Sequence, residues 1–268
     1  MRVNVARVWE DSDYEKVRNL CVQSEGWIEV YNKKDTQVHV KNVPNSDYQM
    51  VKATAYFPDV SSSVVYDVLH DSAYRPKWDK HMAAQASIGI INPNNDVCYH
   101  GLTSYPPIRA RDFVMQRSWL ETENEKMICS HSVCHEDYPP SKGYIRGTIL
   151  LSGYLIREKG DKGGCEVIYI CHSDPKGKLP TWLVNRVTKV VGPKMIKKLH
   201  KACQSYPDWK QKHHPDWKPW ISVEQQIDFP RVDLGKCQPK EYEQNIIDES
   251  NLSAMSISTK DDDEEDEN

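Results

Sequence analysis

Arg75 and Asp79 carry opposite charges and stand four positions apart in the segment YDVLHDSAYRPKWD, residues 66–79. On a helix this spacing brings two side chains to the same face, where they can form an ion pair. A solvated pair of this kind contributes well under about 1 kcal/mol, and from the pattern alone it is the favoured interpretation. Pro76 disfavours helical geometry at the residue before it, so we expect Arg75 just before a helix.

Clusters of cysteine and histidine raise the question of metal binding and catalysis. One such cluster contains Cys129, His131, Cys134 and His135. Its spacing matches no zinc pattern, and alternation along a strand would turn the first two side chains away from the third. The Cys-His-Ser run at residues 171–173 does not define a catalytic geometry, and the chain contains no G-x-S-x-G, H-E-x-x-H or P-loop motif. We therefore expect no metal, no cofactor and no enzymatic activity.

A long stretch near the C-terminus combines apolar periodicity with basic side chains. Residues 179–205 carry apolar side chains at helical spacing, which predicts an amphipathic helix. This helix and the segment after it hold Lys194, Lys197, Lys198, Lys201 and Trp209. Lysine and tryptophan are common at membrane interfaces, so the helix is either an ordinary solvated helix or one that contacts anionic membrane. No nucleic-acid-binding motif accompanies the basic residues, which argues against nucleic acid as a partner.

The composition changes after Trp220. Residues 221–268 show little apolar periodicity and end in DDDEEDEN, which predicts a disordered acidic tail. Ser258 and Thr259 each have an aspartate three positions on, a spacing that suits an acidophilic protein kinase of the casein-kinase type. Our hypothesis is that the tail competes with membrane for the basic helix. Phosphate adds about −1.5 to −2 charges per site and would weaken membrane contact.

The elements that must position these residues follow from the spacing of apolar side chains. Helical spacing predicts helices over residues 11–26, 59–70 and 179–205. Alternation predicts strands over residues 36–43, 48–57, 96–105, 112–121, 126–134, 144–157 and 165–171. Short connections between the later strands predict an antiparallel meander. We expect an α+β domain in which a curved antiparallel sheet and a long C-terminal helix enclose either a filled core or a ligand cavity.

Composition indicates the setting in which the chain works. The 268 residues carry a net charge of −4, and 38% of them are hydrophobic, enough for a sizeable core. No apolar run reaches the roughly 18 residues of a membrane span, and the first ten residues do not resemble a signal peptide. The eight cysteines form no C-x-x-C pair, so free thiols are expected. These features predict a cytoplasmic protein that is only transiently at membranes.

Four segments give a more specific indication: residues 66–79, RARDFVMQRSW at 109–119, DPKGKLPTWLVN at 174–185 and GPKMIKKLHKACQSYPDWKQKH at 192–213. In this order they resemble the START-domain lipid-transfer family, and in particular its phosphatidylcholine-transfer branch. The resemblance covers residues 9–220 and leaves residues 1–8 as an N-terminal extension. It implies a helix-grip fold, in which the curved sheet grips the C-terminal helix as a lid over an apolar tunnel for one glycerophospholipid.

The resemblance also implies roles for individual residues. Arg75 would face the lipid phosphate and Asp79 would hold its guanidinium, which in an apolar tunnel is costly unless paired. A tyrosine and a tryptophan that contact choline in this branch align with Leu69 and His100. Because aromatic rings favour quaternary ammonium groups, this departure predicts weaker choline selectivity. The expected ligands are therefore phosphatidylcholine and phosphatidylethanolamine.

Alternatives to a carrier that shuttles phospholipid between membranes remain open. One is a lipid sensor or adaptor that presents its loaded state to a protein partner. Another is a carrier of a sterol or a sphingolipid. A third is a scaffold whose cavity is filled by its own side chains.

Overall fold

The computed structural model of this chain describes residues 2–104, 108–159, 164–180, 183, 192–240, 242 and 247–252. The helices are α1 (Asp11–Val22), α2 (Ser62–His70), α3 (Arg75–Trp78) and α5 (Gly192–Gln211), with 3₁₀ turns at Val223–Gln226 and Leu234–Cys237. The strands are β1 (Ile28–Lys33), β2 (Thr36–Lys41), β3 (Met50–Phe57), β4 (Met82–Asn92), β5 (Asn95–Leu102), β6 (Ala110–Glu121), β7 (Glu125–Ser132), β8 (Tyr144–Arg146), β9 (Thr148–Lys159) and β10 (Gly164–Asp174). Among the described residues, no helix is both long enough and apolar enough to cross a membrane.

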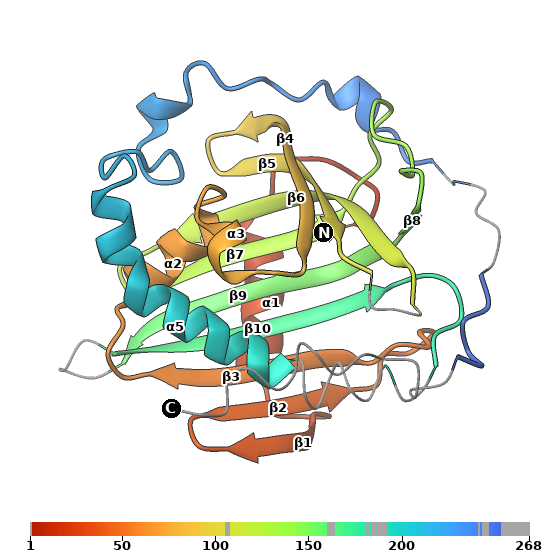
Figure 1. Ribbon diagram of the computed structural model, residues 1–268, viewed down its shortest axis with the longest axis horizontal. Coiled ribbons are helices and arrows are strands. Elements are labelled where there is room, and N and C mark those ends of the chain that lie inside the picture. Colours follow the sequence, from red (N-terminus) through yellow and green to blue (C-terminus); the bar gives the residue numbers. More distant parts are fainter. Residues whose placement is uncertain are drawn as a thin grey trace.

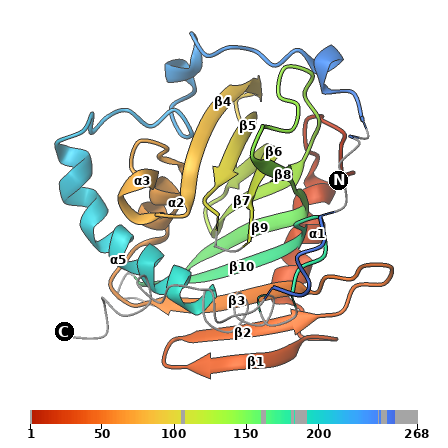
Figure 2. The same cartoon turned by 45° about the vertical axis from the view of Figure 1, so that its right-hand side comes forward.

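These strands form one sheet in the order β1-β2-β3-β10-β9-β7-β6-β5-β4, with β8 off this path. Neighbours along the order are antiparallel, whereas β8 runs parallel to β6. The sheet curves, and α5 crosses its concave side (Figure 1; Figure 2). The predicted α+β architecture, with a curved antiparallel sheet and a C-terminal helix, is confirmed.

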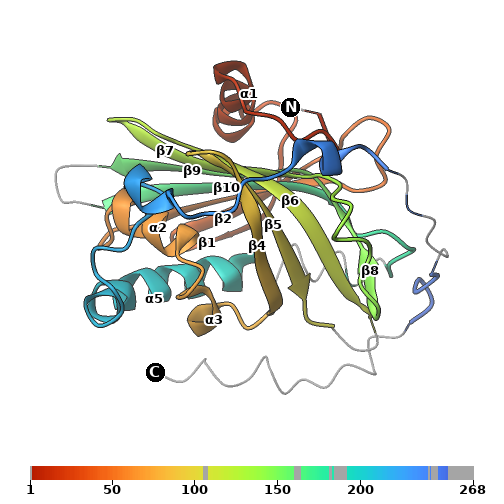
Figure 3. The same ribbon diagram turned by 90° about the horizontal axis from the view of Figure 1, so that it is seen from above.

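Helix α1 lies on the convex side of the sheet, opposite α5 (Figure 3). It begins after Glu10, whose backbone N–H donates to the Asp13 carboxylate at 3.1 Å and whose carbonyl accepts from the Asp13 N–H at 2.9 Å. Val17 and Cys21 are one turn apart and pack into a buried cluster with Met127 of β7 and other strand residues. This cluster makes α1 a backing for the central strands.

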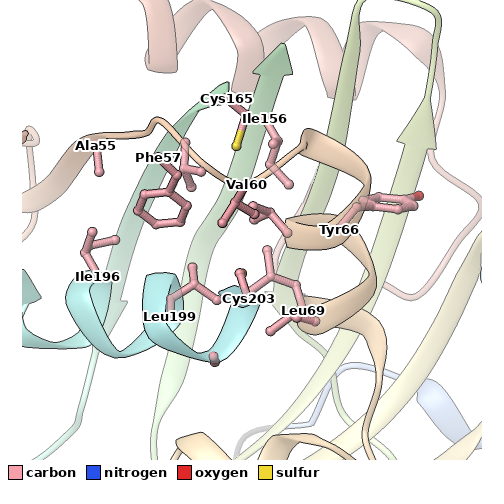
Figure 4. Packing of buried hydrophobic residues seen from close by; sticks show 14 of the residues in the cluster. Ala55, Phe57, Val60, Tyr66, Leu69, Ile156, Cys165, Ile196, Leu199 and Cys203 are labelled. Carbon is pink, nitrogen blue, oxygen red and sulfur yellow. The ribbon is translucent and has the colours of Figure 1, made fainter. Parts of the chain in front are cut away.

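Helices α2 and α5 pack on the concave side (Figure 4). The buried face of α5 presents Ile196, Leu199, Cys203 and Tyr206, whose spacing of three or four residues places them on one stripe. Each fully buried side chain of this size contributes about 1.5–3 kcal/mol, so this stripe holds α5 firmly against the domain. Ser61 begins α2, and its hydroxyl accepts a hydrogen bond from the backbone N–H of Val64.

The chain beyond α5 runs around the outside of the domain (Figure 1). We call this segment, residues 212–240, 242 and 247–252, the C-terminal strap. It covers the edge of β4, where the Val232 N–H donates to the Ile90 carbonyl at 3.0 Å and the Ile90 N–H donates to the Pro230 carbonyl at 2.9 Å. Covering an edge strand removes a site at which other chains could pair.

The far end of the strap is fixed by a buried charge. Glu249 is 3% exposed, and its carboxylate lies 2.7 Å from Arg111 Nη2 at the start of β6. The sequence predicted a disordered tail from residue 221, whereas the described strap has two 3₁₀ turns and the Arg111–Glu249 pair in this range. Its contacts are mainly backbone hydrogen bonds and buried polar groups, which apolar periodicity does not register. Residues 253–268 lie outside the described part of the chain.

Candidate functional site

Arg75 and Asp79 form an ion pair across the single turn of α3. Arg75 Nε lies 2.8 Å and Nη2 2.7 Å from the same oxygen, Asp79 Oδ2. The Asp79 N–H also donates to the Arg75 carbonyl at 3.0 Å, which closes the turn. The Asp79 side chain is buried, whereas the Arg75 side chain is 24% exposed, and its guanidinium carbon lies 4.5 Å from the centre of the Trp78 ring. The structure thus brings these two predicted residues together and supports the arginine from two sides.

Arg75 is the first residue of α3, one position later than the expected location just before the helix. Pro76 takes the second position, where a backbone N–H has no helical acceptor and none is lost. Tyr74 precedes the helix with dihedral angles that are already helical. The turn therefore tolerates proline directly after the arginine.

A second arginine–aspartate pair lies between β5 and β6, and sequence reasoning missed it. Asp96 and Arg117 are direct partners in the register of these strands, and Arg117 Nε donates to Asp96 Oδ1 at 2.9 Å. A further contact joins Arg117 Nη2 to Asp96 Oδ2, so the pair is bidentate. The available signal was an opposite charge in each of two adjacent apolar strands. To pair these two charges, the pairing register of β5 and β6 must be known, and a single sequence does not provide it.

Several polar side chains of the strands lie on the concave side of the sheet, the side that α5 crosses, and we call this region the enclosed space (Figure 1). His100, Arg117, Tyr154 and Tyr169 all retain partial accessible surface. Burial nevertheless lowers the pKa of His100 to about 3, helped by the charges of Arg117 and Arg75, and burial raises the pKa of Tyr154 to about 12. Groups desolvated to this degree are not in bulk water. Tyr154 also packs against the cluster that contains Ile196 and Leu199 of α5, so this face of the strands is the concave one.

The polar groups of this space are concentrated near α3. The rings of Tyr154 and Tyr169 are 4.5 Å apart, and Ser152 Oγ lies 3.4 Å from the Tyr169 hydroxyl. The charges of Arg75 and Asp79 act on the Tyr154 pKa in opposite directions, which places the α3 pair within electrostatic range of the phenol. The space can thus offer a cation to an anionic group and aromatic faces to a cationic one.

The predicted membrane-contact residues of α5 lie in two settings. Lys194, Lys197 and Lys201 are exposed on one face of the helix, and Lys198 is partly buried. Trp209 is half-buried, with its ring centre 4.7 Å from that of Tyr74 and 4.2 Å from that of His213. Trp209 is therefore a packing residue in this structure, whereas the three exposed lysines form a continuous basic face.

Two further groups of predicted residues do not form part of the enclosed polar site. Leu69 is buried in the cluster between α2 and α5, close to Cys203 (Figure 4). The predicted phosphorylation sites, Ser258 and Thr259, lie outside the described residues.

The cysteine and histidine residues lie in separate packed environments. Within the described ranges, no three histidine, cysteine, aspartate or glutamate side chains gather in a metal-binding arrangement. Cys171 has surface toward the enclosed space, and burial raises its pKa. His172, the next residue on β10, lies 2.9 Å from the hydroxyl of Ser46. Successive strand residues point to opposite faces, so this pair has no dyad geometry.

A surface hollow of about 690 Å³ lies away from these charges. It is lined by Ala83, Thr103, Ser104, Ile108, Arg109, Ala110, Gly143 and Tyr144. None of the paired arginines or aspartates contributes to its wall. The converging polar groups make the enclosed space, rather than this hollow, the candidate binding site.

Comparison with known proteins agrees with this geometry. The family model described as START domain matches residues 7–208. START domain-containing protein 10 of Mus musculus is 38% identical over 220 residues, 82% of this chain and 75% of that protein. Phosphatidylcholine transfer protein of Bos taurus is 28% identical over 192 residues, 70% of this chain and 84% of that protein. The crystal structure of human STARD10 superimposes with a TM-score of 0.81 at 36% identity, covering 87% of this chain and 94% of that one. The chain belongs to the START domain family.

Proposed function

We propose that this chain binds one glycerophospholipid in the enclosed space and transfers it between membranes. The observation that carries the proposal is the pair of inward arginine–aspartate contacts, Arg75–Asp79 and Arg117–Asp96, in a space bordered by Tyr154. An apolar wall stabilises acyl chains by about 0.8 kcal/mol per buried CH₂. The similarity to a phosphatidylcholine transfer protein and to START domain-containing protein 10 supports the same ligand class.

In this proposal Arg75 contacts the lipid phosphate. A single oxygen of Asp79 contacts the Nε and Nη2 groups on one side of the guanidinium. The planar guanidinium has further N–H groups on another side that suit a bidentate contact with phosphate. Removal from water is costly for an unpaired guanidinium, so Asp79 also keeps the site stable when no lipid is bound. Both carboxylate oxygens of Asp96 contact Arg117. Arg117 therefore contributes positive potential instead of a second bidentate contact with the phosphate.

The same groups support a mixed head-group range. Tyr154 and Tyr169 offer aromatic faces that attract the quaternary ammonium of phosphatidylcholine. His100 is neutral at physiological pH because its pKa is about 3, so it does not repel an ammonium group. A neutral imidazole also has a nitrogen that can accept a hydrogen bond from the N–H groups of phosphatidylethanolamine. Both phospholipids are therefore proposed ligands.

Transfer requires a path that avoids bulk water and uses no covalent step. A two-chain phospholipid faces a barrier of order 20 kcal/mol to enter water alone, given about 0.8 kcal/mol per CH₂. The exposed face of Lys194, Lys197 and Lys201 is the proposed contact with anionic membrane, from which the lipid enters or leaves. The chain would act as a peripheral carrier without a cofactor.

We further propose that phosphorylation of the acidic tail at Ser258 and Thr259 by an acidophilic kinase weakens this contact. Each phosphate adds about −1.5 to −2 charges to a segment that already ends in DDDEEDEN. The added charge would compete with anionic lipid for the basic face of α5. A chain that ends at residue 252 and binds and transfers like the full chain would remove this idea.

The test of the carrier proposal is transfer of fluorescent phosphatidylcholine from donor to acceptor vesicles. The full chain should accelerate transfer at catalytic amounts, and labelled cholesterol and ceramide should move no faster than without protein. Binding of phospholipid without accelerated transfer would instead support a lipid sensor. Selective acceleration of sterol or ceramide would refute the phospholipid assignment.

A further inference from the structure

We propose that Asp71 is a positioning residue, which couples the C-terminal half of α5 to the turn that presents Arg75. The proposal rests on the assignment of Arg75 to the lipid phosphate. Asp71 is the C-cap residue that follows α2 and is 5% exposed, so both carboxylate oxygens act inside the protein. Each oxygen serves a different part of the chain.

The first oxygen shapes the approach to α3. Asp71 Oδ1 accepts hydrogen bonds from the N–H groups of Ala73 at 3.1 Å and Tyr74 at 3.3 Å. The Asp71 carbonyl accepts from the N–H groups of Tyr74 and Arg75, both at 3.1 Å. Such short-range side-chain contacts define the dihedral angles of a turn. These hydrogen bonds therefore set the direction of the chain between the end of α2 and Arg75 at the start of α3.

The second oxygen belongs to α5. Asp71 Oδ2 accepts the Tyr206 hydroxyl at 2.9 Å and lies 2.8 Å from Lys210 Nζ. Lys210 is 6% exposed and also donates to the Trp217 carbonyl at 2.9 Å. An ion pair buried to this extent fixes geometry strongly, because displacement of either partner leaves an unpaired charge away from water.

A second contact reinforces the same link. The Tyr74 hydroxyl donates to the Ala202 carbonyl of α5 at 3.0 Å, and the Tyr74 ring centre lies 5.0 Å from that of Tyr206. The residue directly before Arg75 is thus clamped to α5 by a hydrogen bond and by ring packing. Loss of the Asp71 carboxylate should free both the turn and the helix end, and the Arg75 guanidinium should lose its fixed direction.

The test compares two lipids that differ only in the phosphate-bearing head group. Wild type, Arg75→Ala and Asp71→Asn are incubated with vesicles that contain phosphatidylcholine and diacylglycerol of the same chains, and bound lipid is counted by native mass spectrometry. The ratio of phosphatidylcholine to diacylglycerol should fall in Asp71→Asn by about tenfold, the equivalent of one lost charge-assisted hydrogen bond, and approach that of Arg75→Ala. A general loss of stability would lower both lipids together.

Asp112→Asn is the matched control. Asp112 is also buried and paired with an arginine, Arg146, and within the described part of the chain its carboxylate accepts hydrogen bonds from Arg146 and from the Ser141 N–H, not from α3 or α5. This variant should keep the wild-type ratio. If Asp71→Asn does not fold, Tyr206→Phe replaces it, because this variant removes only the hydroxyl that donates to Asp71. Its ratio of phosphatidylcholine to diacylglycerol is then compared with that of wild type and Arg75→Ala.

The outcomes separate the two proposals. A wild-type ratio in Asp71→Asn or Tyr206→Phe, together with a reduced ratio in Arg75→Ala, would overturn the positioning role alone. Equal ratios in wild type and Arg75→Ala would refute phosphate recognition by Arg75, and the positioning role would fall with it.

Discussion

Arg117 on β6 and Asp96 on β5 face each other across adjacent strands, with Nε 2.9 Å from Oδ1. Asp96→Ala should lower the free energy of unfolding by about 3–5 kcal/mol, because it leaves a guanidinium without its partner away from water. Replacement of both residues by Asp96→Leu and Arg117→Met should recover most of that loss. Urea unfolding of the three proteins measures this, and equal stability of wild type and Asp96→Ala would contradict a buried, obligatory pair.

The strap supplies a second prediction. Arg111 also donates to the carbonyls of Arg109, Pro175 and Lys176, so Glu249→Gln leaves the guanidinium partly satisfied. The expected loss is about 1–3 kcal/mol in the free energy of unfolding. Asp248→Asn, at the exposed neighbouring position, is the control and should change little.

Truncation tests the same feature without substitution. A chain that ends at residue 246 should lose as much stability as Glu249→Gln, and one that ends at residue 252 should unfold like the full chain. If removal of residues 247–268 has no effect on urea unfolding, the far end of the strap does not contribute to the stability of the fold.

Buried histidines predict a pH dependence of stability. Burial lowers the pKa of His131 to about 4 and that of His100 to about 3, below the usual value of 6.5. Between the unfolded-state pKa of 6.5 and these lower folded-state values, the unfolded chain binds more protons than the folded chain. The free energy of unfolding therefore falls as pH decreases below about 6.5 and is regained as pH rises. For His131 alone the loss between pH 7 and pH 5 is about 2 kcal/mol.

Urea unfolding of wild type and His131→Gln at pH 7 and pH 5 checks this assignment. The variant should lose less stability than wild type on acidification, whatever its stability at pH 7. An identical loss in both proteins would mean that His131 is not held neutral by burial.

The basic face of α5 predicts how the chain meets membrane. Each lysine near an anionic surface contributes about 1 kcal/mol, so Lys194→Glu, Lys197→Glu and Lys201→Glu together should weaken vesicle binding by at least about a hundredfold. Exposed Lys16, Lys33 and Lys34, changed to glutamate together, form a charge-matched control outside α5. Cosedimentation with phosphatidylserine vesicles at low and high salt compares them, and equal weakening by both triple variants would assign the effect to net charge.

The sequence predicted those elements whose burial follows a simple period. The seven predicted strands correspond to eight observed ones, because the strand predicted over residues 144–157 is divided into β8 and β9. The amphipathic α5 was also identified, because Ile196, Leu199 and Cys203 mark one helical face. The missed strands are at the two edges of the sheet. β1 is largely exposed, and β4, with the sequence MAAQASIGIIN, is rich in small residues and has irregular register with β5. Neither strand alternates large apolar residues with polar ones along its whole length, because β4 alternates mainly through alanines and β1 carries Asn32 where an apolar residue would be expected.

The part of the candidate site that could be predicted is the ion pair whose two residues lie within one helical turn. Arg75 and Asp79 are four residues apart, and their pair could be expected from spacing. The Arg117–Asp96 and Lys210–Asp71 pairs join residues 21 and 139 positions apart, so only the tertiary structure brings them together. Trp209 was expected at a membrane interface, but periodicity could not show that Tyr74 would cover its ring.

The most direct measurement of the central claim is native mass spectrometry of the full chain after incubation with phosphatidylcholine and phosphatidylethanolamine vesicles, followed by lipid extraction. Wild type should carry one glycerophospholipid per chain, Arg75→Ala should carry markedly less, and Arg75→Lys, which keeps the charge without the fork, should lie between them. Protein that stays bare under these conditions, or an adduct of equal occupancy in wild type and Arg75→Ala, would contradict phospholipid recognition by Arg75.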